Sequence, residues 1–418
     1  MVLNLVWVGF ILVGFVVALV RLAQGDLAIF TKVITALFDT AKTGFDISLG
    51  LVGIMSLWLG LMKIGEQAGM IQLFAKAVGP LFRRLFPDIP PNHPAGGSIV
   101  MNASANMLGL DNAATPLGLK AMRELQEINP QKDVASNPMI MFLVLNTAGI
   151  TLIPTSVIAM RQSIAIEQGV QGFNAADIFL PTLIGTFISF VAGLVAVAWV
   201  QRIRLWQGPI LAFFAGFGAL MAGLYLALSG LPPKQMAEVI GLIGSGVIFG
   251  VIVLFVAAGA WRRINVYEVF VDGAKEGFQV AVTIIPYLIA ILAAISVFRS
   301  TGCMDFVIAG IASLVGALGM NTDFVPALPV GLMKTLSGSG ARGLMIDVMK
   351  TYGVESFQGR LAAIIQGSTE TTFYVLAVYF GSVNIRKTRY ALSCGLFADA
   401  VGLVGAILVG YAFYGHLA

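Results

Sequence analysis

The sequence predicts an all-α, polytopic transmembrane protein with two internal repeats of inverted topology, each with a helical hairpin and broken polar helices. Asp, Glu, Lys and Arg make up 11% of its 418 residues, against roughly 25% in soluble domains, which excludes an ordinary soluble protein. Apolar residues make up 58% and gather in long stretches, and a helix of about 20 such residues crosses a hydrocarbon core. A short sequence near residue 41 also recurs near residue 274.

Nine long apolar stretches predict the helices that span the membrane. The first lacks the basic region and small-residue cleavage pattern of a signal peptide, so we expect it to remain as a helix. The nine stretches are 2–20, 47–62, 139–160, 178–200, 210–228, 239–261, 280–298, 361–383 and 390–413.

Four other segments have a different character. Segments 26–45 and 262–278 mix apolar residues with charges at helical spacing, which predicts helices that lie in the membrane interface. Segments 70–86 and 304–318 are apolar but too short for independent spans, so we expect them to be the returning arms of helical hairpins.

The repeat rests on matches at a nearly constant shift. Ala-Lys-Thr-Gly-Phe at 41–45 recurs as Ala-Lys-Glu-Gly-Phe at 274–278, and Gly69 matches Gly302 at the same shift of 233 residues. We therefore predict a first repeat at 1–205, a linking transmembrane helix at 206–236 and a second repeat at 237–418. Chance likeness between apolar sequences is the alternative.

A single linking span would invert the second repeat if each repeat crosses the membrane an even number of times. Basic residues at 202–204, 262–263 and 386–389 can then all be cytoplasmic, as the positive-inside rule favours. Arg21, Lys32 and Lys42 would fall on the opposite side and argue against this topology.

A polar segment in the first repeat is the first candidate binding element. Ser98, Asn102 and Asn106 recur every four residues and so share a helix face, while Asp111 and Thr115 share another. Polar side chains at membrane depth are costly unless each has a partner. Gly109 and Pro116 would break this helix and free backbone groups that can bind a solute or an ion. An interhelical hydrogen-bond cluster or an interfacial loop is the alternative.

Two Ser-Gly pairs, at Ser337 and Ser339, mark the matching segment of the second repeat. They precede a helical pattern, and a helix N-terminus of this kind is suited to an anionic group. Arg342 would strengthen that preference, or it is instead the structural partner of Asp347 or Glu370.

Glu370 lies in the middle of an apolar segment, between hydroxyl residues, and a carboxylate at that depth indicates a functional site. The matching segment of the first repeat supplies an amide and hydroxyls but no charge. In the alternative, the hydroxyls bond to their own helix and Glu370 pairs with Arg342. Asp399 is a second candidate, as a proton carrier.

The predicted substrate- or ion-binding residues come from both repeats. They are Asn102, Asn106, Asp111, Asn112, Thr115, Asn146, Thr147, Thr151, Ser337, Ser339, Arg342, Ser368, Thr369, Glu370 and Thr372.

Composition and motifs argue against several other functions. Cys303, Cys394, His93 and His416 are too few for a zinc or iron-sulfur site, so we expect no metal site and no cofactor. We find no Ser-His-Asp set, Walker loop or dinucleotide fingerprint, so an enzyme is not expected. Basic residues do not form a stripe, which argues against nucleic-acid binding. The expected partners are a small solute and the lipid bilayer, and homo-oligomerisation stays open.

The polar motifs resemble those of a known family. Residues 1 to about 200 are similar to spore maturation protein A through 102–118, and residues from about 235 are similar to spore maturation protein B through 337–343 and 367–372. The chain thus resembles a fusion of the two, which belong to the nucleoside-recognition or Gate group. This resemblance implies the bacterial inner (cytoplasmic) membrane and distant kinship with concentrative nucleoside transporters.

Together these observations predict a secondary transporter of a small polar, anionic or nucleoside-like metabolite, working by alternating access. Because no nucleotide-hydrolysing domain is evident, uphill transport would use a gradient of Na⁺ or H⁺. A membrane-embedded ligand sensor or assembly factor and an integral membrane enzyme are the alternatives.

Overall fold

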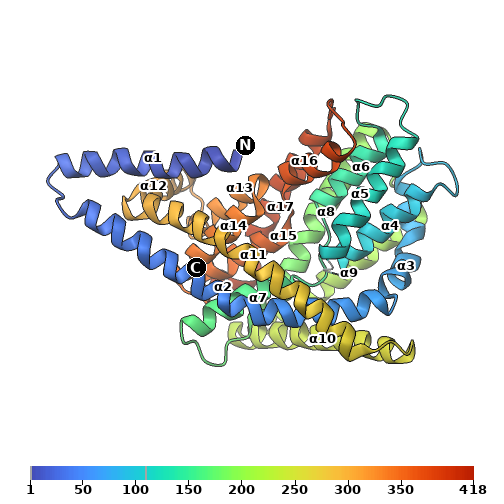
Figure 1. Cartoon of the computed structure of the whole chain (residues 1–418), viewed down its shortest axis with the longest axis horizontal. Helices are drawn as coiled ribbons and strands as arrows, with labels where there is room; N and C mark the ends of the chain where they lie inside the picture. Colours follow the sequence, from blue (N-terminus) through green and yellow to red (C-terminus); the bar gives the residue numbers. More distant parts are fainter. Residues whose placement is uncertain (1, 109–110) are drawn as a thin grey trace.

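The chain folds as a bundle of helices, as predicted (Figure 1). The structure is a computed structural model that describes residues 2–108 and 111–418. Within these residues, eight helical segments are long and apolar enough to cross a membrane, and one of them, Phe357–Ser382, is interrupted by a break. The all-α, polytopic architecture is therefore confirmed.

Two series of helices follow one another in the same order, and α9 (Gly208–Ser229) lies between them. The first series is α1 (Val2–Ala23), α2 (Ile29–Gln67), α3 (Met70–Leu85), α4 (Pro94–Met107), α5 (Asp111–Glu127), α6 (Asn137–Thr147), α7 (Thr155–Glu167) and α8 (Phe179–Gln201), with the short η1 (Ala175–Ile178). The second is α10 (Pro233–Trp261), α11 (Val266–Ser300), α12 (Cys303–Ala317), α13 (Leu328–Leu336), α14 (Gly338–Tyr352), α15 (Phe357–Ser368), α16 (Thr372–Ser382) and α17 (Ala391–Tyr414), with the short η2 (Val325–Ala327) and η3 (Gly415–Leu417).

Helices α2 and α11 pack against each other along much of their length, and Figure 1 shows them side by side, blue and orange. Gly60 approaches Phe270, whereas Gly44, earlier in α2, approaches Ile289, later in α11. The two helices are therefore antiparallel. Helices α8 and α17 pair in the same way, since Ser189 Oγ donates to the Ala398 carbonyl and Gly405 lies against Ile188. Equivalent helices of the two series thus run in opposite directions, as expected for inverted repeats.

The prediction of separate interfacial helices at 26–45 and 262–278 is wrong. The first is continuous with the span at 47–62 in α2, and the second with the span at 280–298 in α11. The charges that suggested separate helices lie on the same long helices instead. Lys63 pairs with Glu276 at 3.2 Å between α2 and α11, so some of these charges join the two repeats.

Two predicted spans are each divided into two shorter helices. The stretch 139–160 contains most of α6 and the start of α7, and the stretch 361–383 contains most of α15 and all of α16. The first break, at 148–154, contains Gly149 and Pro154, while the second, at 369–371, is extended at Thr369 and Thr371. Both breaks leave backbone groups outside regular helices.

Candidate functional site

A cavity of about 840 Å³ lies where four pairs of helices end and begin. These pairs are α4 and α5, α6 and α7, α13 and α14, and α15 and α16, two from each series. Its polar lining residues are Asn106, Thr115, Asn146, Thr151, Thr155, Ser156, Lys334, Ser337, Ser339, Arg342, Gln366, Glu370, Thr371, Tyr374 and Tyr379.

Eight residues predicted for the site line this cavity, four from each half of the chain. They are Asn106, Thr115, Asn146, Thr151, Ser337, Ser339, Arg342 and Glu370. Asp111 and Asn112 stand at the start of α5, but their side chains lie outside the part of the chain that the structure describes.

The remaining predicted residues are buried behind the cavity wall. Ser368 Oγ donates back to the Ile364 carbonyl at 2.6 Å, as the structural alternative anticipated. Thr369 packs against α17 at Gly402, and Thr372 Oγ1 donates to Asp399 Oδ2 at 2.6 Å. Asn102 and Thr147 are also fully buried.

The two helix breaks meet at the cavity. The Glu370 backbone N–H donates to the Thr147 carbonyl at 2.9 Å, so the second break is held against the end of α6. The first turns of α7, α14 and α16 all contribute lining residues. At α14, Ser337 Oγ accepts from the Gly340 N–H at 3.1 Å and caps the helix. Because a helix N-terminus carries partial positive charge, these three ends favour an anionic or electron-rich ligand.

Amide side chains form a network that joins the two series. Asn106 donates to Asn146 Oδ1 at 2.9 Å, and the Tyr379 hydroxyl of α16 donates to the same oxygen at 3.5 Å. Asn102 donates to the Ala114 carbonyl at 2.7 Å and to the Tyr379 hydroxyl at 3.4 Å. The network fixes one wall of the cavity and leaves amide groups beside it.

Three charged side chains of the described chain line the cavity: Lys334, Arg342 and Glu370. Lys334 Nζ lies 3.7 Å from Glu370 Oε2, and Lys334 is only 4% exposed. Neither structural partner proposed for Arg342 pairs with it, because Asp347 forms its ion pair with Arg299 of α11. Within the described residues Arg342 makes no ion pair or hydrogen bond, so its donors remain available to a ligand.

Sequence reasoning gave no role to several residues that the structure brings to the site. Lys334 was visible as a charge in an apolar segment, but its depth depends on the packing of α13. Gln366 and Tyr379 belong to predicted spans, and only the position of the break shows that they face the cavity.

A buried charge cluster beyond the cavity was also missed. Asp177 pairs with Arg161, which is completely buried, and accepts a hydrogen bond from Arg360 Nε at 2.9 Å. Arg161 also donates to the Ala175 carbonyl, and the Tyr414 hydroxyl donates to the Asp177 carbonyl at 2.7 Å. Arg161 directly follows the predicted span 139–160 and Asp177 directly precedes the span 178–200, and charges at segment ends are usually solvated.

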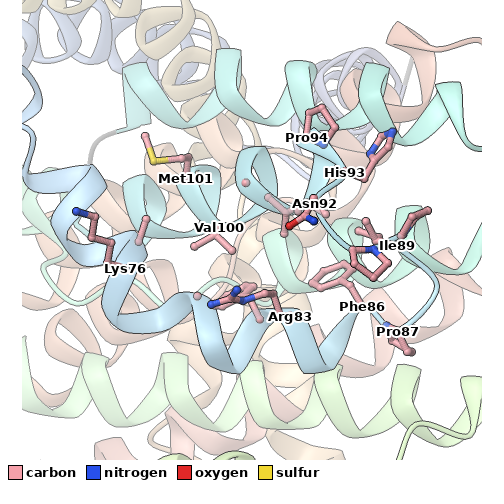
Figure 2. A pocket seen from close by; sticks show the side chains of 18 of the residues that line it. Lys76, Arg83, Phe86, Pro87, Ile89, Asn92, His93, Pro94, Val100 and Met101 are labelled. Atoms are coloured by element: carbon pink, nitrogen blue, oxygen red, sulfur yellow. The ribbon is translucent and has the colours of Figure 1, made fainter.

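A second cavity, of about 810 Å³, lies between α3 and α4 (Figure 2). Figure 2 shows Arg83 on one side of it and Val100 and Asn92 on the other. Its lining comes from the first series alone. The cavity between the two series is therefore the stronger candidate for a site that both repeats build.

Comparison with known proteins agrees with the two-part organisation. A family model described as Gate, nucleoside recognition, matches residues 48–163 and 281–386, one segment in each series. Spore maturation protein A of Bacillus subtilis (strain 168) is 42% identical over 192 residues, which cover 46% of this chain and 92% of that protein. Spore maturation protein B of the same organism is 41% identical over 178 residues, covering 43% of this chain and 98% of that protein. No solved structure is significantly similar to the chain.

Proposed function

From the premise that this chain belongs to the Gate family of nucleoside-recognition membrane proteins, we propose that it is a secondary transporter of a small polar metabolite. The observation that carries this proposal is the cavity between the two series, lined by helix ends from both. Transporters with inverted repeats place their sites at such interfaces, where broken helices supply free backbone groups.

The lining chemistry supports a nucleoside-like or anionic solute. Nucleobases are planar and present alternating donors and acceptors, which amides such as Asn106, Asn146 and Gln366 can match. Tyr374 offers an aromatic face for stacking. Arg342 and the capped start of α14 favour a carboxylate or phosphate. The volume of about 840 Å³ falls within the roughly 300–1,000 Å³ usual for small-molecule sites.

The proposed mechanism is alternating access in a bacterial cytoplasmic membrane, driven by an ion gradient. The antiparallel pairs α2 with α11 and α8 with α17 would form the frame. The shorter helices around the breaks would move against that frame and open the cavity to each side in turn. Glu370, exposed at 53% and paired with Lys334, would couple the ion to the solute.

The test is uptake of radiolabelled nucleosides, nucleotides and dicarboxylates into vesicles that contain the purified chain, with and without inward Na⁺ and H⁺ gradients. Glu370→Gln should abolish gradient-driven accumulation, whereas Glu355→Gln, an exposed carboxylate away from the cavity, should not. Arg342→Ala should weaken uptake of anionic solutes more than that of neutral ones.

The rival functions give different results in the same preparation. A sensor would bind a nucleoside without flux, and an enzyme would convert a substrate in detergent, where no gradient exists. Either outcome would overturn the transport proposal. Unchanged accumulation by Glu370→Gln would remove only its coupling role.

A further inference from the structure

Asp399 is a buried carboxylate that lies within α17, behind the cavity. It is 7% exposed, and its Oδ2 accepts a hydrogen bond of 2.6 Å from Thr372 Oγ1 at the start of α16. Its Oδ1 is buried and makes no hydrogen bond of normal geometry in the described chain, and the side chain of Thr335 lies close to the carboxyl group. A carboxylate oxygen without a partner at this depth is unfavourable unless a cation or a proton satisfies it.

Thr147, the last residue of α6, has a second side-chain oxygen without a partner, and its methyl group faces α17. It is fully buried, and its Oγ1 also has no partner among the described residues. A Cβ atom at Gly395 would lie 3.5 Å from Thr372 Oγ1 and 3.7 Å from Thr147 Cγ2. Gly395 precedes Asp399 by one helical turn and therefore shares its face. Thr147, Thr372 and Asp399 thus gather along one face of α17.

Two carboxylates in this region, Asp399 and Glu370, share the ammonium group of Lys334. Lys334 of α13 and Glu370 of the second break are the charged groups that act electrostatically on Asp399. Lys334 forms an ion pair with Glu370 at 3.7 Å. The ammonium that acts on Asp399 is therefore already paired with another carboxylate. Arg342 belongs to the cavity wall and pairs with neither carboxylate.

The first series contains an equivalent cluster without a carboxylate. There Ser368 packs against Gly185 of α8, as Thr147 and Thr372 pack against Gly395 of α17. Ser368 Oγ donates to the Ile364 carbonyl at 2.6 Å, and Thr186 Oγ1 to the Leu183 carbonyl at 3.1 Å. These two hydroxyls bond to their own helices, whereas Thr182 Oγ1 of α8 has no partner in the described chain. The carboxylate of Asp399 is therefore the feature that separates the two clusters.

We propose that Asp399 Oδ1, Thr147 Oγ1 and Thr372 Oγ1 bind a sodium ion, and that this ion is the one coupled to transport. Its role in coupling rests on the proposed function, whereas sodium binding does not. A proton on Asp399 would satisfy only one of the two unpartnered oxygens. A sodium ion can bind both Asp399 Oδ1 and Thr147 Oγ1. Carbonyls freed by the break at 148–154 lie next along the chain from Thr147 and can complete the coordination. Carboxylate, hydroxyl and carbonyl oxygens are the ligands that hard cations prefer.

The experiment measures thermal unfolding of the full chain in detergent, without solute, over a series of NaCl concentrations. Choline chloride keeps the ionic strength constant, and a KCl series tests selectivity. Sodium should raise the unfolding temperature with a saturable dependence, because a ligand that binds only the folded state stabilises it. Direct binding of ²²Na⁺ gives the dissociation constant.

Asp399→Asn and Thr147→Val should each raise the sodium dissociation constant at least tenfold. The matched controls Thr186→Val and Ser368→Ala alter the neutral cluster of the first series. They should leave the sodium dissociation constant unchanged. Using both site variants keeps the test decisive if one of them fails to fold.

Each remaining outcome has a defined meaning. The proposal is overturned if sodium does not raise the unfolding temperature of the wild-type protein. It is also overturned if sodium stabilises the Asp399→Asn protein as much as the wild type. Stability that changes with pH but not with sodium shows that Asp399 holds a proton instead and also overturns it. Sodium binding without any uptake would reject the transport function and leave the site intact. Uptake that is independent of sodium would reject coupling through this site.

Discussion

At the scale of single residues, the helix breaks decide which polar side chains face the cavity. Thr371, within the second break, lines the cavity, whereas its neighbour Thr372 is turned toward Asp399. Ser368, at the end of α15, bonds to its own helix. The polar segments found in the sequence all contribute residues to the cavity. The sequence does not show the residue at which each helix ends. The direction in which each polar side chain points could therefore not be predicted.

Long-range partners were also beyond the sequence. The pair Lys334 and Glu370 joins two segments whose relative depth depends on the packing of α13 against α16. The sequence suggested Arg342 as the partner of Glu370, because an arginine is the obvious counter-ion. No local sequence pattern indicates that Asp347 forms its ion pair with Arg299 of α11 instead.

Tyr379 offers a test of the amide network. Its hydroxyl bonds to Asn146 and Asn102 at 3.5 and 3.4 Å, and its ring stacks on Phe142. Tyr379→Phe keeps the stacked ring and removes both hydrogen bonds, so it should lower the free energy of unfolding by about 1 kcal/mol. Unfolding by SDS titration measures this. Tyr374→Phe, on the same helix but exposed, is the control and should have almost no effect; equal losses in the two variants would contradict the network.

At the scale of elements, α2 and α11 show why charge patterns mislead in membrane helices. The charges at 26–45 and 262–278 resemble those of interfacial helices, yet each segment continues into the apolar helix that follows it. Continuity depends on close packing between the two long helices, where Gly60, Gly273 and Gly277 let their backbones approach. Small residues at such contacts are typical of membrane helices. The repeat was visible in the sequence, but the antiparallel pairing that it produces was not.

Gly277 tests that close approach. A Cβ atom there would lie 2.5 Å from the Met55 carbonyl oxygen and 2.7 Å from Ser56 Cα, both backbone atoms that cannot move independently. Gly277→Ala should therefore lower the free energy of unfolding by roughly 1–3 kcal/mol. Gly53→Ala in α2 is the control, because nothing lies within 4 Å of its Cβ position and alanine favours a helix. SDS titration of both variants is the measurement, and a Gly277→Ala protein as stable as Gly53→Ala would disprove the close contact.

At the scale of the whole molecule, the two repeats hold each other through reciprocal contacts. Gly69 and Gly302 begin α3 and α12 in the left-handed conformation that favours glycine. A Cβ atom at Gly69 would lie 2.5 Å from Arg262 Nη1, and one at Gly302 would lie 2.5 Å from Arg21 Nη2. Each arginine follows or ends the first helix of the opposite repeat. The match of Gly69 with Gly302 was found in the sequence, and the structure gives its physical reason.

The buried cluster of Arg161, Asp177 and Arg360 joins the two repeats. Asp177→Asn would leave two guanidinium groups buried without a carboxylate, which costs about 3–5 kcal/mol. Arg161→Met would leave the neutral pair of Asp177 with Arg360 and should destabilise the protein less. The two variants are compared by thermal unfolding and by the monodisperse fraction on size-exclusion chromatography. The reverse order of stability would contradict this charge balance.

In the proposed mechanism the shorter helices move against the frame, and we expect those of one repeat also to move relative to those of the other as the cavity opens to each side in turn. Helices α7 and α14 both line the cavity with their first turns, and at their far ends Lys350 Nζ contacts Glu167 Oε1 at 2.5 Å. Gln168 reinforces this end by donating to the Met349 carbonyl at 2.9 Å. A covalent link between positions 167 and 350 should therefore hold the molecule in one state.

The double variant Glu167→Cys/Lys350→Cys, linked by a bifunctional methanethiosulfonate reagent, should lose solute uptake and recover it on reduction. The native thiols of Cys303 and Cys394 are buried and should compete little for the reagent. The control Asp272→Cys/Lys275→Cys forms an equivalent link within α11 alone, where both side chains are exposed, and should retain uptake. Retained uptake in the fully linked Glu167→Cys/Lys350→Cys protein would mean that α7 and α14 do not separate during transport.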